Sequence, residues 1–132
     1  MRRLLPDTSA WVEYLRDGSD SPSGRLLAPA AAAGEIVVCG PVVAELLAGA
    51  SAADRESLHT ILLGLPWADL GRAEWAAVGR LAADLRGAGA TVPLTDVEIA
   101  VAAIGAEADV ITRDSDFDRF AAVETRLRVR RP

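Results

Sequence analysis

Short apolar runs that alternate with longer helix-patterned segments constrain the fold of this chain more than any other feature. The runs lie at residues 4–5, 36–39, 110–112 and 127–129, with a weaker candidate at 65–69. Runs of this kind, bounded by Gly, Pro or Asp, are typical of buried strands. Strands that alternate with helices form a mostly parallel sheet, so we expect an α/β sandwich.

The segments between these runs carry the apolar period of helices. We expect helices around residues 11–15, 25–33, 41–50, 51–63, 72–86 and 95–108, and a short one after the acidic loop 113–118. Thr8 or Ser9 is the expected cap of the first helix, and Pro29 is expected to kink or divide the second. With 132 residues and no linker, the chain is expected to form one domain over residues 1–132.

The composition removes several kinds of chemistry. All 14 basic residues are Arg, so no Lys can act as a nucleophile or bind a phosphate. His59 is the one imidazole and Cys39 the one thiol, which excludes a Cys/His zinc site and a disulfide within the chain. Because Cys39 lies in an apolar run, we expect it to be a core residue. Carboxylates, hydroxyls and guanidinium groups remain for function.

Apolar runs long enough to cross a membrane are missing from the sequence. A membrane-spanning helix needs about 20 consecutive apolar residues, and no run approaches that length. The basic N-terminus is followed by only two apolar residues before Pro6, unlike a signal peptide. We therefore expect a cytoplasmic protein that does not contact membranes.

Four acidic residues occur where the expected strands end or the helices begin. Asp7 and Asp114 follow strands, Glu45 lies one turn into the helix after residues 36–39, and Asp96 lies at a helix start. The carboxyl ends of parallel strands share one edge of a sheet, so these acids are expected to gather there. Clustered carboxylates repel one another unless a hard cation binds them, and Mg²⁺ or Mn²⁺ is the expected ion.

Each of these acids also has a simpler interpretation. Asp7 and Asp96 are good N-cap residues and would then serve only their helices. Glu45 would be a solvated surface residue, although its neighbours are apolar. Glu98 follows Asp96 by two residues, so it points to another side of the helix and is expected at the surface.

The acidic loop after the 110–112 run has an alternative as well. Asp114, Asp116 and Asp118 would form a solvated turn if no ion binds. A helix-loop-helix calcium site is excluded, because its sixth and twelfth positions require Gly and Glu, and this chain has Arg119 and Thr125 there.

Four blocks of the sequence resemble the signature blocks of PIN-domain ribonucleases, specifically the VapC-type toxins of type II toxin–antitoxin modules. They are 7–15 (DTSAWVEYL), 41–49 (PVVAELLAG), 95–100 (TDVEIA) and 112–117 (TRDSDF). The resemblance extends over nearly the whole chain, with the blocks in the family's order and spacing. It implies a PIN-like three-layer α/β/α sandwich with a mostly parallel central sheet.

The resemblance also implies an activity and its residues. The expected function is a Mg²⁺-dependent endoribonuclease toxin that hydrolyses RNA phosphodiester bonds by metal-activated water, with Mn²⁺ as a possible substitute. By resemblance, the catalytic and metal-binding residues are Asp7, Glu45, Asp96 and Asp114, Asp116 is an additional or alternative metal ligand, and the hydroxyls of Ser9 and Thr112 orient the carboxylates. The implied partners are an RNA substrate, a cognate VapB-type antitoxin that places an Arg among the carboxylates, and a second copy in a homodimer.

The net charge of −5 opposes RNA binding, so local Arg side chains must attract the substrate. Arg16 and Arg113 lie near the acidic residues in sequence and are expected to bind nucleic acid, unless each pairs with a neighbouring acid. The terminal Arg130 and Arg131 are expected to be a solvated tail.

Two other classes of function fit part of the pattern. A phosphohydrolase would use Asp7 as a nucleophile, but the chain has no Lys and has Ser9 where a second acid is expected. A non-catalytic binding module would keep the fold, but all four acids are present.

Overall fold

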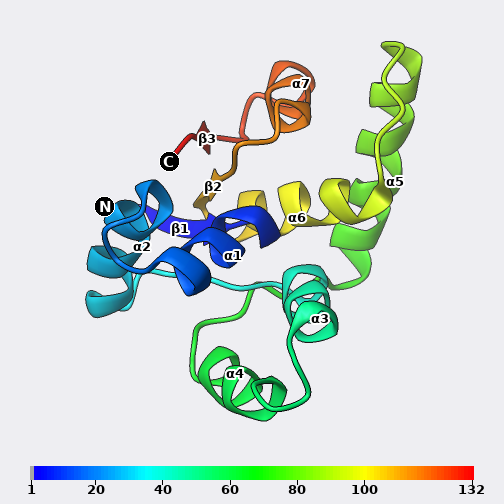
Figure 1. The fold of residues 1–132 in the computed structure, drawn as a ribbon. Helices are drawn as coiled ribbons and strands as arrows, with labels where there is room; N and C mark the ends of the chain where they lie inside the picture. Colours follow the sequence, from blue (N-terminus) through cyan, green and yellow to red (C-terminus); the bar gives the residue numbers. More distant parts are fainter. Residues whose placement is uncertain (1) are drawn as a thin grey trace.

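The computed structural model describes residues 2–132, which form helices and short strands in alternation (Figure 1). In chain order the elements are β1 (Arg3–Pro6), α1 (Thr8–Asp17), α2 (Pro22–Ala32), α3 (Gly40–Gly49), α4 (Arg55–Leu63), α5 (Arg72–Gly87), α6 (Leu94–Gly105), β2 (Ala108–Ile111), α7 (Asp116–Val123) and β3 (Val129–Arg130).

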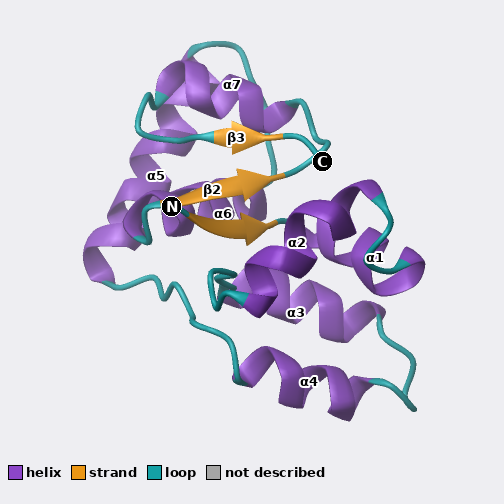
Figure 2. Ribbon diagram, turned by 90° about the vertical axis from the view of Figure 1, so that its left-hand side faces the viewer, coloured by secondary structure: helices purple, strands orange, loops and turns teal. Residues whose placement is uncertain are grey.

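The sheet is parallel and has the order β1-β2-β3. Arg3 pairs with Ala108 and Pro6 pairs with Ile111, so β1 and β2 end level with each other. All three arrows in Figure 2 point the same way, and their carboxyl ends meet at one edge. Asp7 and Thr112, which directly follow β1 and β2, therefore start from neighbouring positions at that edge.

Helices cover both faces of the sheet. Figures 1 and 2 together show α1 and α2 on one face and α5 and α6 on the other, with α7 packed against α5 and α6. The expected three-layer α/β/α arrangement is confirmed. Fully buried apolar side chains from the strands and from both helix layers fill the space between, among them Leu5, Leu27, Ile99, Ile111, Phe117 and Phe120.

The expected strand at 36–39 is present only as a buried extended segment. Ile36 forms an isolated parallel bridge with Leu4, and Val38 forms one with Trp67, so the weak candidate at 65–69 also lies beside the sheet. Val37 donates its N–H to Leu4 of β1, whereas the backbone of Val38 bonds to Pro66 and Ala68 instead. Helix α3 begins two residues after Val38, at Gly40. Neither ladder therefore grows into a full strand.

Several helix starts differ from the expected ones. Asp7 caps α1 in place of Thr8 or Ser9, because its side chain accepts the backbone N–H of Ala10. Ser21 caps α2, which begins at Pro22 and runs through Pro29 without a break. The hydrogen bond that Pro29 cannot donate would go to Arg25, and both residues are exposed to water.

Two further sequence expectations concern the core and the membrane. Cys39 is fully buried as expected, and burial raises the pKa of its thiol to about 11, which keeps it protonated and unreactive. Within residues 2–132, every helix is too short or too polar to cross a membrane.

Candidate metal centre

Three carboxylates from two separate parts of the chain form the centre of the site. Asp96 lies in the first turn of α6, Asp114 in the loop after β2, and Asp116 at the start of α7. One carboxylate oxygen from each lies within 4.8 Å of the others. A group of oxygen donors with net negative charge matches the preference of Mg²⁺ and Mn²⁺, so these residues fit the ion that the sequence predicts.

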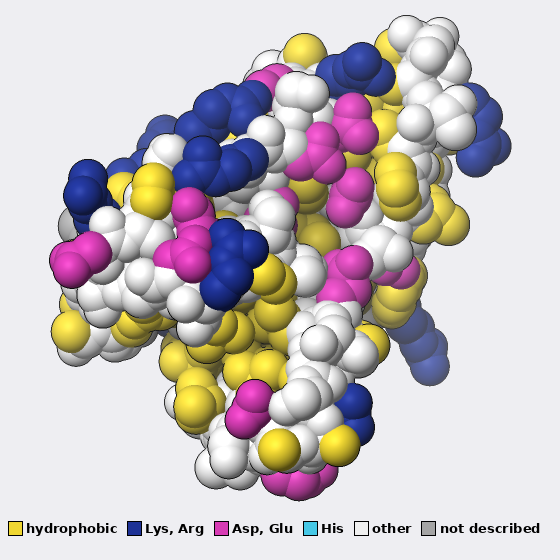
Figure 3. Space-filling view, viewed as in Figure 1, with side chains coloured by type: hydrophobic (Ala, Val, Ile, Leu, Met, Phe, Trp, Pro, Cys, Tyr) yellow, Lys and Arg dark blue, Asp and Glu magenta, His cyan; other side chains and the backbone are white. Residues whose placement is uncertain are grey.

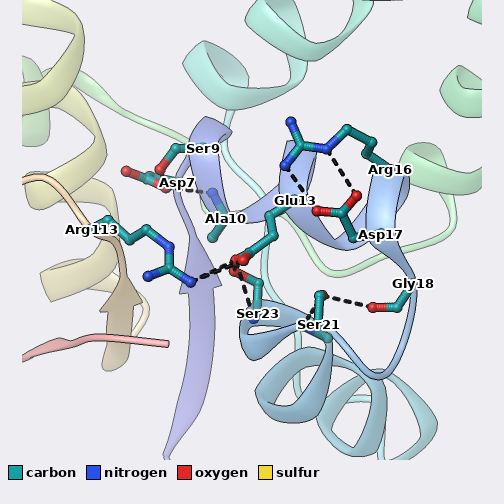
Figure 4. Close-up of polar contacts among 11 residues, drawn as sticks. Asp7, Ser9, Ala10, Glu13, Arg16, Asp17, Gly18, Ser21, Ser23 and Arg113 are labelled. Carbon is teal, nitrogen blue, oxygen red and sulfur yellow. Dashed lines mark hydrogen bonds and ion pairs between the residues drawn. The ribbon is translucent and has the colours of Figure 1, made fainter.

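Asp7 lies beside this group and is itself only 7% exposed. Its Oδ1 accepts the Ser9 hydroxyl at 2.7 Å and the Ala10 N–H at 2.9 Å, as Figure 4 shows, while its Oδ2 accepts the hydroxyl of Thr112. Asp7 therefore does cap α1, as the simpler interpretation predicts. The cap uses one oxygen only, and the other is directed toward the end of β2.

Thr112 connects Asp7 to the other acids. Its side chain is fully buried, it donates to Asp7, and its oxygen accepts the backbone N–H of Asp114 at 2.9 Å. Asp114 in turn accepts the N–H of Asp116 at 2.9 Å through its side chain. A continuous series of hydrogen bonds thus runs from α1 to the start of α7 and sets where the carboxylates lie.

Glu45 approaches the site from α3. Its Oε1 accepts the Thr8 hydroxyl at 2.9 Å, which holds it next to the start of α1. The side chain is exposed, as the surface interpretation predicts, yet its charge acts on Asp96 as described next.

The pKa of Asp96 depends on the charges of all the other predicted acids. Burial raises this pKa to about 6, and the charges of Asp114, Glu45, Asp7 and Asp116 add to the rise. The simpler interpretation of Asp96 as a helix cap is wrong, because Pro93 occupies the cap position and Asp96 lies three residues further on. Asp96 is therefore the carboxyl on which the other four act.

Glu98 is not among the carboxylates that raise the pKa of Asp96. Its charge acts instead on Cys39, at the start of α3. Glu45 acts on the same thiol, and Glu98 is half-buried, so the expectation that it points to another side of α6 stays a prediction.

The two Arg residues expected to bind nucleic acid both pair with neighbouring acids. Arg16 contacts Asp17 at 2.9 Å on the exposed side of α1. Nη2 of Arg113 donates to both oxygens of Glu13, at 2.9 and 3.1 Å, as Figure 4 shows. These pairs are the alternative that the sequence leaves open, and nucleic-acid binding by either Arg stays a prediction.

Glu13 and Ser23 belong to this arrangement, and the sequence analysis did not identify them. The buried Ser23 donates its hydroxyl and its backbone N–H to Glu13, which lowers the pKa of Glu13, and the Arg113 guanidinium lowers it further. The three residues come from α1, α2 and the loop after β2. No local spacing connects them, so only the packing of these elements could reveal the contact.

The C-terminal Arg130 and Arg131 are exposed as expected, but their side chains contact other residues and do not form a free tail. Nη1 of Arg131 donates to the carbonyl of Arg113 at 2.8 Å, and its Nη2 forms an ion pair with Asp118. Arg130 lies 4.0 Å from Asp109. Pairing of β3 with β2 brings these residues to the sheet edge. The terminal sequence alone does not predict this pairing.

An apolar groove of about 510 Å³ lies between α1, α3 and α4, and Glu45 is one of its lining residues. Figure 3 shows its hydrophobic side chains in the hollow between α1 and the lobe that contains α4. It is lined by Val12, Leu15, Arg16, Glu45, Leu46, Gly49, Ala50, Ser51, Asp54, Ser57, Leu58 and Ile61. Glu45, whose charge acts on Asp96, therefore also lines the groove.

Solved structures with the same fold include several toxin–antitoxin complexes. VapBC2 from Rickettsia felis, bound to a DNA fragment from its promoter, has a TM-score of 0.77 and 22% identity, over 97% of this chain and 97% of that one. FitAcB from Neisseria gonorrhoeae has a TM-score of 0.71 and 20% identity, over 96% and 95%. At these identities the comparison shows a shared fold.

Sequence relatives are closer. Ribonuclease VapC11 of Mycobacterium tuberculosis is 36% identical over 126 residues, which are 91% of this chain and 92% of that protein, and VapC ribonuclease Mb1587 of Mycobacterium bovis matches to the same extent. The model of the PIN domain family matches residues 4–123, which include all the acids of the site. The chain therefore belongs to the PIN domain family and is a VapC-type member of it.

Proposed function

We propose that this chain is a divalent-metal-dependent endoribonuclease, the toxin of a toxin–antitoxin pair. The observation that carries the proposal is the group formed by Asp96, Asp114 and Asp116, whose carboxylate oxygens lie within 4.8 Å of one another. Asp7 is joined to this group through Thr112, and the charge of Glu45 acts on Asp96. Relatives that are 36% identical over nearly the whole chain bear the name ribonuclease, which supports RNA as the substrate.

The residues of the site have two roles, which are binding the metal and orienting its ligands. Asp96, Asp114 and Asp116 would hold Mg²⁺ or Mn²⁺, with Asp7 and Glu45 beside them. Such an ion, when bound, supplies an activated water and stabilises the charge that develops on the phosphate. Ser9 and Thr112 donate to different oxygens of Asp7 and thereby fix its orientation.

The acidic net charge does not prevent RNA binding if metal occupies the site. Five of the 19 acidic residues form the site, and the remaining 14 equal the number of Arg residues. The rest of the chain is thus electrically balanced. In Figure 3 the Arg side chains gather beside the acidic ones, where they can contact an RNA backbone.

Arg113 is well placed for such a contact. Glu13 engages only Nη2, and within residues 2–132 the other two guanidinium nitrogens of Arg113 have no hydrogen-bond partner. Arg113 directly precedes Asp114, so a phosphate bound there would lie beside the metal ligands. Arg16 would contact the RNA further along α1.

Cleavage of RNA substrates with and without metal tests the proposal. Wild-type protein should cleave with Mg²⁺ or Mn²⁺ and stop in EDTA, and the products should carry 5′ phosphates. Asp7→Asn should lose more than about 100-fold in rate, a larger effect than losing a partner of a metal ligand. Asn keeps an oxygen to cap α1, so the variant should fold.

Asp84→Asn is the matched control, because Asp84 is exposed on α5 and lies outside the site. Its rate should equal that of wild type. Cleavage that survives EDTA would contradict the metal mechanism and favour an aspartyl nucleophile, and complete inactivity toward RNA would favour a binding module.

The apolar groove supports an antitoxin as the partner. Val12, Leu15 and Ile61 are 44%, 49% and 57% exposed, which leaves apolar area uncovered in the single chain. A segment in the groove reaches Glu45, and an Arg on it would meet several carboxylates. VapBC complexes among the solved structures with this fold also support this partner.

Substitution of Ile61 tests the antitoxin proposal. Ile61→Asp places a charge in the groove and should weaken binding of the cognate antitoxin by about 30-fold or more, as for an interface hot spot. Leu63→Asp is the control, because Leu63 is on the same helix, is 58% exposed and does not line the groove. Calorimetry should show near-normal binding for Leu63→Asp, and both variants should cleave RNA as wild type does. Equal weakening by the two substitutions would contradict the groove as the site.

A further inference from the structure

Arg131 joins the two ends of the loop that carries two of the site's acids. Its guanidinium donates to the carbonyl of Arg113 at 2.8 Å and pairs with Asp118 in the first turn of α7. Between these two points lie Asp114 and Asp116. One side chain from the C-terminus thus bridges the segment 113–118.

The backbone holds Arg131 in place for this contact. The N–H of Thr112 donates to the carbonyl of Arg130 at 3.1 Å, the last hydrogen bond between the β2 and β3 regions. Figure 2 shows the C-terminus at the edge of the sheet where β2 ends. Arg131 is therefore the next residue along and lies directly beside Arg113.

The loop needs such a contact because its carboxylates repel one another. Asp114 and Asp116 lie within 4.8 Å of Asp96, and without metal their charges favour a more open loop. Hydrogen bonds inside the loop join near neighbours, such as Asp116 N–H to Asp114 and Asp118 N–H to Ser115. Thr112 holds the start of the segment, because its hydroxyl accepts the N–H of Asp114. Arg131 is the side chain that joins the start of the segment, at Arg113, to its end, at Asp118.

We propose that Arg131 is a positioning residue that keeps Asp114 and Asp116 in the arrangement that binds metal. The proposal rests on the proposed function, since it needs a metal at this site. It differs from a role in substrate binding, because it requires an effect in the absence of RNA.

The affinity for Mn²⁺ distinguishes a positioning role of Arg131 from a purely electrostatic effect of its charge. Arg131→Gln removes a positive charge near the acids, so electrostatics alone would tighten the binding of a cation. Loss of the bridge should instead weaken Mn²⁺ binding, by about tenfold, the lower end of the range for partners of metal ligands. Isothermal titration of RNA-free protein with Mn²⁺ measures this directly.

Arg128→Gln is the matched control, because it removes the same charge from the same segment. Within residues 2–132 the Arg128 side chain makes no hydrogen bond or ion pair, so its loss should leave Mn²⁺ affinity unchanged or slightly higher. Asp118→Asn should reproduce part of the loss. The double variant with Arg131→Gln should be no weaker than Arg131→Gln alone, since both remove one bridge.

Amide hydrogen exchange of the metal-free protein gives a second readout. Arg131→Gln should speed exchange in residues 114–118 several-fold and leave α5 unchanged. Unchanged exchange there, or Mn²⁺ affinity equal to that of Arg128→Gln, would overturn the proposal. A raised KM for RNA with normal Mn²⁺ affinity would show that Arg131 contacts substrate instead. Failure of the wild type to bind Mn²⁺ would refute the proposed function, whereas the exchange result tests the bridge by itself.

Discussion

Asp96→Asn should abolish RNA cleavage and at the same time make the metal-free protein more stable at neutral pH. Asp96 belongs to the three-carboxylate group, so its loss removes one of the proposed metal ligands. Burial and four neighbouring carboxylates hold its pKa near 6, which means that the ionised form is unfavourable in the fold. A neutral amide of the same shape removes that penalty, which is at most about 2 kcal/mol after allowance for solvent screening.

The pH dependence of stability follows from the same shift. Between about pH 4 and pH 6 the folded protein keeps a proton on Asp96 that the unfolded chain has already released. Wild-type stability should therefore fall as the pH rises through this range, and the loss should be complete above about pH 6. This contribution should be missing from the Asn variant.

Thermal unfolding in EDTA from pH 4.5 to 7.5 checks both expectations. At pH 7.5 the Asn variant should melt several degrees above wild type, and the difference should shrink toward pH 4.5. Asp84→Asn controls for the loss of one surface charge. Saturating Mn²⁺ should raise the melting temperature of wild type much more than that of the variant. A lower melting temperature for Asp96→Asn in EDTA would mean that the carboxylate supports the fold and would contradict the repulsion argument.

Residues fixed by the parallel sheet could be placed from the sequence. Asp7 and Asp114 follow apolar runs, and strands that run parallel bring such residues to one edge whatever the rest of the chain does. Asp96 could be placed because it lies in the first turn of α6, and Glu45 because it lies further along α3, the helix that follows the 36–39 segment. The sequence also indicates the ion, since no soft or nitrogen ligand accompanies the acids.

Contacts between side chains from separate elements could not be placed in this way. Glu13, Ser23 and Arg113 meet only because α1, α2 and the loop after β2 pack together. The sequence alone indicates that Arg131 belongs to a charged tail, because only the pairing of β3 with β2 brings it next to Arg113. The missing strand at 36–39 has a similar cause, because its length depends on two neighbours and on where α3 begins.

Thr112→Val should reduce cleavage by about 10- to 100-fold, because Thr112 orients two acids at once. Valine fills the same buried space but neither donates to Asp7 nor accepts the N–H of Asp114. Those two polar groups lose their partner inside the protein, so the free energy of unfolding should fall by about 1–3 kcal/mol.

Thr112→Ser separates the hydroxyl from the rest of the side chain. Serine keeps both hydrogen bonds and loses one buried methyl group, which costs about 1 kcal/mol of stability. Cleavage at saturating Mn²⁺, measured well below the melting temperatures, should then be near wild type for Ser and low for Val. Urea unfolding should show that both variants are destabilised. If activity depended on stability alone, the two would lose it in proportion to their unfolding free energies. Loss in Val alone therefore assigns the effect to the hydroxyl that connects Asp7 with Asp114.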